Sequence, residues 1–138
     1  MSDIKWGRVL LGGLLAGLLS NVLGIGSAHF LFAEHIKALI ERLHLTFGPG
    51  VALLHVSMRL AFGVGVVWLY AAIRPRFGAG PRTAMVAGLA MWLFTFVFSF
   101  AGILPYDLYP ARTLAYAAIW TFFETQACAL VGGWVYRE

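Results

Sequence analysis

Charged residues and cysteine are both scarce in this chain. Asp, Glu, Lys and Arg make up 12% of its 138 residues, whereas soluble domains carry roughly 25%. The single cysteine, Cys128, cannot form an intramolecular disulfide or a CxxC metal or redox motif, and we interpret it as a small packing residue. These absences exclude an ordinary soluble domain and a disulfide-stabilised secreted one.

Apolar residues, by contrast, dominate the composition. They account for 61% of the chain, and the mean hydropathy is +0.83. Four apolar runs each reach the roughly 20 residues that a helix needs to cross the hydrocarbon core, and the segmented alternation of a transmembrane barrel is missing. The sequence therefore predicts an all-α polytopic membrane protein, an antiparallel four-helix bundle forming one domain over residues 1–138. The predicted spanning helices cover about residues 9–32, 51–73, 83–104 and 113–136.

The first apolar run has some features of a secretory signal peptide. Lys5 and Arg8 precede it, and Gly26-Ser27-Ala28 resembles a signal-peptidase site. The run is longer than the usual apolar region of a signal peptide. We therefore interpret it as a retained first helix.

Basic residues flank the four runs unevenly. Because Lys and Arg accumulate on the cytoplasmic side, this bias predicts a multi-pass protein of the bacterial inner membrane with both termini in the cytoplasm. The sequence pI of about 9.6 then reflects topology and anionic headgroups rather than nucleic-acid binding. The expected partners are membrane lipids and either further copies of the chain or a larger membrane complex. Lys5, Arg8, Arg74, Arg76, Arg82 and Arg137 fall on the predicted inner side, and Lys37, Arg42 and Arg112 on the outer side.

The segment between the first two runs has an amphipathic pattern. From Phe32 to Phe47, apolar residues recur at helical spacing with charged residues off that stripe, and Gly48-Pro49-Gly50 follows. This pattern predicts a short helix at about residues 33–47 that lies on the interface or caps the bundle. A gate or a partner-docking element is the alternative.

Small residues are regularly spaced in the first run. The spacing of Gly13 and Gly17, continued by Ser20 and Gly24, allows another backbone to approach closely, and such packing drives helix association in lipid. We expect the neighbouring helix to belong to the same chain rather than to another protomer.

Arg59 and Glu124 are ionisable residues deep inside apolar runs. Charges in such positions are costly and mark a functional site by default. Arg59 precedes Trp68 by nine residues, and Glu124 precedes Trp134 by ten. At ~1.5 Å of rise per residue, both lie roughly 14–15 Å from the same interfacial belt of aromatic residues. We predict that the two side chains touch, directly or through water.

Other polar side chains lie at neighbouring depths. His55 and Thr121 share the helix faces of Arg59 and Glu124, and the same rise per residue places several further groups in one layer in the outer half of the bundle. Such a layer is expected to line a small pocket or a narrow water-filled cleft open to the periplasm. The candidate ligand- or ion-binding residues are Arg59, Glu124, His55, Asn21, Thr95, Thr121 and, nearer the outer surface, His29.

Three interpretations of the charged pair remain open. It is a helix clamp, a ligand or ion site, or part of a proton-linked path in an oligomeric transporter or channel. A clamp would be a purely structural role, since buried polar side chains in membrane bundles often only link helices, at about 0.6 kcal/mol per contact. We favour an integral membrane binding or accessory protein with a clamp or an outward-facing pocket.

Enzyme and cofactor signatures are weak. The chain shows no nucleophile–base pair, so no catalytic residue is proposed. Axial ligation of a haem by His29 and His55 is a minor alternative, since their depths differ and no attachment motif is present. No acid–histidine spacing matches a metal motif, and we assign no metal and no cofactor.

Three short stretches resemble small four-helix inner-membrane proteins of bacteria that have no assigned function. They are LLGGLLAG at residues 10–17, WLYAAIRPRFG at 68–78 and GWVYRE at 133–138. The resemblance extends over the chain in outline and implies topology but no substrate. The chain differs from small multidrug exporters, whose essential glutamate lies in the first helix where this chain has Asn21. It also lacks the polar third-helix motif of the fluoride channels.

Overall fold

Helices account for nearly all of the chain in the computed structural model, which describes residues 4–137 and no strand within them. The all-α class is thereby confirmed. The described part of the chain does not include residues 1–3 and 138 of the predicted domain. It also leaves out the side chain of Arg137, one of the basic residues on the predicted inner side. The elements are α1 (Trp6–Phe30), α2 (Ala33–Leu43), α3 (Pro49–Phe77), α4 (Pro81–Trp92), the π-helical turn η1 (Leu93–Val97), α5 (Phe98–Ile103), the 3-10 turn η2 (Leu104–Tyr106) and α6 (Ala111–Arg137).

Four of the helical segments are long and apolar enough to cross a membrane. They are α1, α3, the continuous segment from α4 to η2, and α6, so the chain is a multi-pass membrane protein as predicted. α3 and α4 begin two residues before the predicted bounds, with Pro49 and Pro81 in their first turns, where proline is well tolerated. The predicted interfacial helix, in contrast, ends early at Leu43. His44 adopts a left-handed conformation with φ of 50°, and Phe47 lies beyond the helix.

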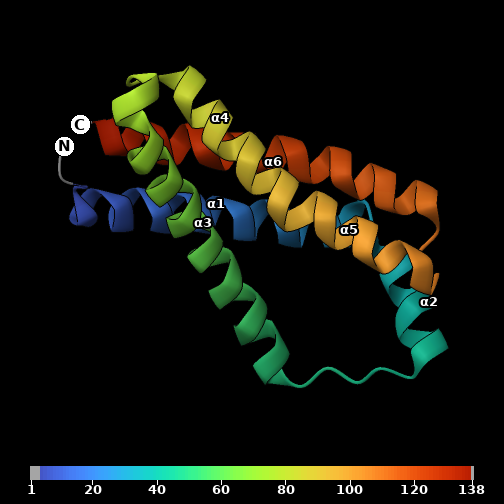
Figure 1. Ribbon diagram of the computed structural model, residues 1–138. Coiled ribbons are helices and arrows are strands. Elements are labelled where there is room, and N and C mark those ends of the chain that lie inside the picture. The colour runs from blue at the N-terminus through green and yellow to red at the C-terminus, as the bar shows by residue number, and fades with distance from the viewer. Residues whose placement is uncertain (1–3, 138) are drawn as a thin grey trace.

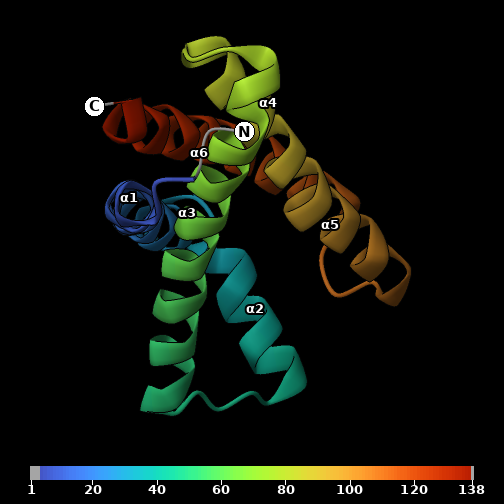
Figure 2. The ribbon, with the colours of Figure 1, turned by 60° about the vertical axis from the view of Figure 1, so that its left-hand side comes forward.

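The spanning helices do not all run parallel. α1 and α6 lie side by side, α4 and α5 follow α6, and α3 crosses α1 diagonally (Figure 1). α1 begins and α6 ends at the end of the bundle that also carries the turn between α3 and α4. α2 lies at the other end of the bundle, together with the connection from α5 to α6. α2 and the first half of α3 both extend beyond α1 and α6 (Figures 1 and 2). The loop at residues 44–48 joins α2 to α3.

One half of the bundle, which we call the closed half, packs tightly. It comprises the beginning of α1, α3 after Arg59, α4 and the end of α6. The backbones of α1 and α3 meet at glycine: a Cβ on Gly17 would lie 2.7 Å from the Cα of Leu60. The predicted close approach is thus confirmed, and it is intrachain. The core that follows is fully or almost fully buried and includes Val9, Ala16, Val67, Tyr70, Ala87, Cys128 and Tyr136.

The other half, the open half, is looser. It comprises α2, α3 up to Arg59, η1 and α5, and none of the residues described in these segments is fully buried. α2 is attached to the connection before α6 by Arg42, whose Nη2 donates to the carbonyl oxygens of Asp107 and Leu108 at 3.0 and 3.2 Å. α2 therefore caps this end of the bundle, which supports its prediction as a cap.

Candidate binding site around Arg59 and Glu124

The predicted contact between Arg59 and Glu124 is present. Nη1 of Arg59, on α3, lies 2.5 Å from Oε1 of Glu124, on α6. The Glu124 side chain is 1% exposed, whereas that of Arg59 is 30% exposed. The carboxylate is therefore the buried member of the pair, and the guanidinium is the member that other molecules can reach.

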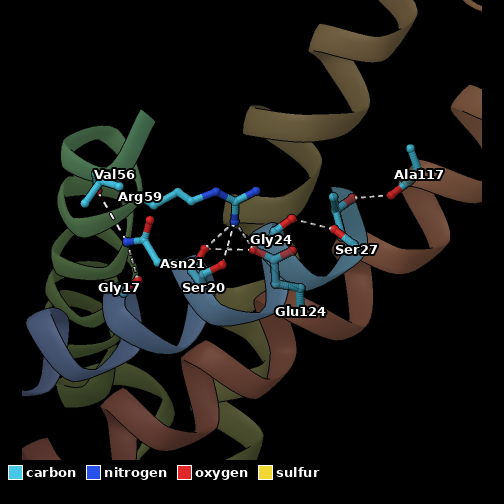
Figure 3. Close-up of polar contacts among 10 residues, drawn as sticks. Gly17, Ser20, Asn21, Gly24, Ser27, Val56, Arg59, Ala117 and Glu124 are labelled. Atoms are coloured by element: carbon cyan, nitrogen blue, oxygen red, sulfur yellow. Dashed lines mark hydrogen bonds and ion pairs between the residues drawn. The ribbon is translucent and has the colours of Figure 1, made fainter. Parts of the chain in front are cut away.

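Ser20 on α1 completes this contact. Its hydroxyl donates to Oε1 of Glu124 at 2.7 Å, and Nη1 of Arg59 donates to its carbonyl oxygen at 2.8 Å and to its Oγ at 2.9 Å (Figure 3). We call Arg59, Glu124 and Ser20 the polar node. Ser20 was predicted only as a member of the small-residue stripe of the first helix. The node thus joins three helices, and α1 contributes as much to it as α3 and α6.

Gly24, one turn beyond Ser20, shapes the space for the guanidinium. A Cβ on Gly24 would overlap the terminal carbon and both terminal nitrogens of Arg59. The absence of a side chain at this position therefore lets the guanidinium lie directly against α1. The small-residue stripe of α1 accommodates the backbone of α3 at Gly17 and a charged side chain at Gly24.

Several polar atoms of the site remain without partners. All hydrogen bonds of the Arg59 guanidinium within residues 4–137 come from Nη1, and Figure 3 shows the dashed lines meeting at that one nitrogen. Nε and Nη2 donate none to the described residues. Two further atoms of the site, Oε2 of Glu124 and Nε1 of Trp120, are fully buried and have no partner in that part of the chain. Buried unpaired groups are rare in proteins and call for a water, ion or ligand explanation.

A cavity of about 430 Å³ lies over the polar node. Arg59 and Glu124 line it from α3 and α6, and α2 covers it with His35 and Ile36, next to Phe32 just before the helix. Its walls are mainly apolar and aromatic. The wall residues include Ala28, Phe96, Phe100, Ile103, Leu114, Ala117 and Trp120.

Two further predicted residues line this cavity. His55 is exposed, and its Nδ1 lies 2.8 Å from the carbonyl oxygen of Val51. The hydroxyl of Thr121 donates to the carbonyl oxygens of Ala117 and Ala118 at 2.9 and 3.1 Å. Both residues share a helix face with their charged neighbour, as the helical spacing predicted.

The remaining three predicted residues do not line the cavity. Nδ2 of Asn21 donates to the carbonyl oxygens of Gly17 at 3.0 Å and of Val56 at 3.4 Å, so it links α1 to α3. Thr95 is exposed on η1, and His29 is exposed near the end of α1. The predicted layer is therefore divided, and His29 and His55 do not share this cavity.

Some lining residues were missed by the sequence analysis. Trp120 lies one turn before Glu124, a spacing that marked it as a neighbour. His35 lies beside the apolar stripe of α2, and Tyr109 belongs to the connection before α6. Burial raises the pKa of the Tyr109 phenol above its ordinary value. The contact between α2 and the connection before α6, which brings His35 and Tyr109 to the same cavity, is not encoded in any local pattern.

Comparison with known proteins gives no relative, since no family model, curated protein or solved structure matches the chain. Within residues 4–137, no group of three or more His, Cys, Asp or Glu residues is placed to hold a metal ion. The fold and the site define a multi-pass membrane protein with a capped cavity over a buried ion pair. Its function must be argued from that geometry.

Proposed function

We propose that this protein is an integral membrane binding protein of the bacterial inner membrane, and that its cavity holds a small amphiphilic molecule against the polar node. The observation that carries the proposal is the combination of an apolar-walled cavity with unpaired polar atoms at one place in its wall. Ligand sites typically have about 300–1,000 Å³ and a few placed polar groups in an apolar lining. The volume of about 430 Å³ falls in that range.

The surroundings of the cavity favour a ligand taken from the membrane. α3 and α5 both line it, and the first half of α3 exposes Leu53, Leu54 and Met58. A molecule dissolved in lipid would reach the cavity without crossing bulk water. The start of α1 and the α3–α4 turn lie at the same end of the bundle, and the basic residues Lys5, Arg8 and Arg82 belong to these segments. By the positive-inside rule, this bias supports a cytoplasmic location for that end and a periplasmic location for the cavity.

A clamp role is compatible with this function, because the same polar node joins α1, α3 and α6. A proton-linked path across the whole bundle is less well supported. It would have to pass the closed half, where Val67, Tyr70 and Tyr136 are buried in the packed core. Binding therefore accounts for more of the structure than transport does.

Filling the cavity tests the proposal. Ala117 lines it from α6, whereas Ala115, two residues earlier on the same helix, is exposed and does not line it. We expect native mass spectrometry of the protein, released from membranes in mild detergent, to show one bound amphiphile. Ala117→Trp should lose this adduct, because the indole occupies its space, and Ala115→Trp should keep it. Identical adducts on both variants, or an empty wild-type protein, would contradict the proposal.

A further inference from the structure

The guanidinium of Arg59 has one edge in use and one edge open. Arginine carries five N–H donors in a rigid, planar fork. In this protein Nη1 makes the contacts to Ser20 and Glu124, and Nε and Nη2 make none to the described residues. Nε and Nη2 share one edge of the planar guanidinium, where an N–H bond of each points outward in parallel. That pair of donors matches the two oxygens of a carboxylate or phosphate.

The exposed fractions decide which member of the ion pair a ligand meets. Arg59 keeps 30% of its side-chain surface, and Glu124 keeps 1%. Both side chains line the cavity, and the larger exposed surface of Arg59 makes the cation the main contact of a ligand. Glu124 and Ser20 hold the guanidinium in place from the other side, so its open edge is preorganised.

The titratable groups around the cavity can support a negative charge. Glu124 offsets one positive charge, and its Oε1 contacts Nη1 of Arg59 and the hydroxyl of Ser20, away from the open edge. His35 on α2 and His55 on α3 line the same cavity, and an imidazole N–H can donate a hydrogen bond. Tyr109 adds a hydroxyl. Within the described lining, only Glu124 is an acid, so basic groups outnumber acidic ones around the open edge.

We infer that the polar end of the ligand is an oxyanion carried on an apolar chain, bound through two hydrogen bonds by Nε and Nη2 of Arg59. This inference rests on the proposed binding function. The oxyanion chemistry is shared by the carboxylate of a free fatty acid and the phosphate of an anionic phospholipid. The apolar wall formed by Phe96, Phe100 and Leu114 receives the chain.

A set of ligands with one chain and different headgroups tests the inference. The full-length protein, in nanodiscs of phosphatidylcholine, is titrated with dodecanoate, dodecyl phosphate, dodecanol and dodecylamine, with calorimetry as the readout. Two charge-assisted hydrogen bonds should make at least one of the two oxyanions bind at least about tenfold more tightly than dodecanol. Tighter binding of dodecanoate indicates the fatty acid as source, and tighter binding of dodecyl phosphate indicates the phospholipid.

Arg59→Lys is the diagnostic variant. Lysine keeps the positive charge beside Glu124 but lacks the fork, so the preference for oxyanions over dodecanol should fall about tenfold. Arg112→Lys makes the same change at an exposed arginine of α6 that does not line the cavity, and it should keep the preference.

The possible outcomes separate the two proposals. Equal binding of dodecanol and both oxyanions, blocked by Ala117→Trp, would overturn the oxyanion inference and leave the binding function intact. A preference for dodecylamine would do the same. If none of the four compounds binds, both proposals fail. Competition by inorganic phosphate alone, at the concentration of dodecyl phosphate, would overturn the requirement for an apolar chain.

Discussion

The closed and open halves of the bundle are held together in different ways. In the closed half, glycine lets α1 and α3 touch, and side chains such as Val67 and Tyr70 are fully buried. In the open half, the described part of α2, of α3 before Arg59 and of α5 has no fully buried residue. There the links are polar: Asn21 to Val56, and Arg42 to the connection before α6. Lipid removes the hydrophobic drive between helices, so close packing and polar contacts are the means that remain.

The polar node lies at the seam between these halves. All buried residues of α3 follow Arg59, beginning at Gly63, whereas the first half of the helix extends away from the bundle (Figure 1). A cavity exists at this point because close packing stops while the helices are still held by an ion pair. The clamp and the pocket are therefore two consequences of one arrangement.

The largest expected effect comes from breaking the seam. Glu124→Leu leaves the Arg59 guanidinium with no countercharge in a mainly apolar site. Loss of one partner of a buried pair costs about 3–5 kcal/mol, and the partial exposure of Arg59 places our expectation near the lower end, at about 3 kcal/mol. The free energy of unfolding in mixed micelles, measured by denaturant titration, checks this value.

The double variant Arg59→Leu with Glu124→Leu is the matched control for that prediction. Removing both charges leaves no uncompensated ion, so it should recover most of the lost stability. It should also lose the preference for oxyanion ligands. A double variant as unstable as Glu124→Leu would show that the cost arises from packing rather than from charge.

A smaller effect is expected in the closed half. Gly17→Leu forces a side chain into the backbone of α3 at Leu60, and overpacking of this kind costs about 1–3 kcal/mol. Gly26→Leu changes a glycine of the same helix whose Cβ would meet nothing within 4 Å. Its unfolding free energy should stay within about 0.5 kcal/mol of the wild-type value. Equal losses in both variants would refute the close approach of α1 and α3.

The sequence predicted the depth of a residue along its helix better than the direction in which its side chain points around the helix axis. Arg59 and Glu124 were placed correctly because both depths were counted from tryptophans in the same belt, along uninterrupted α-helix. Thr95 was placed in the predicted layer by the rise of an α-helix, but it lies within η1, which is π-helical. A π-turn changes the register of all later side chains, and no local pattern announced it.

The direction of side chains around a helix also decided which residues joined the polar node and its cavity. Ser20 was visible as a small residue on the stripe of α1, but its hydrogen bonds depend on how α1 is rotated between α3 and α6. The cover over the cavity depends on the long-range contact of Arg42 with Asp107 and Leu108. Amphipathic spacing predicted that α2 exists and caps the bundle. It carried no information on which polar residues α2 would bring to the site.

The smallest expected effect concerns the cover of the open half, through Tyr109. Its phenol lines the cavity next to α2, and burial raises its pKa. A phenol with a raised pKa favours the folded state in its neutral form. That contribution is fully present below the ordinary value of about 10 and is lost as the pH rises through the raised value.

Wild-type protein should therefore lose more thermal stability between pH 9 and pH 11 than Tyr109→Phe does. Tyr106→Phe, which removes an exposed phenol three residues away and keeps Tyr109, should show the wild-type loss. If Tyr109→Phe and the wild-type protein lose the same stability over this range, burial of Tyr109 does not contribute to closing the open half.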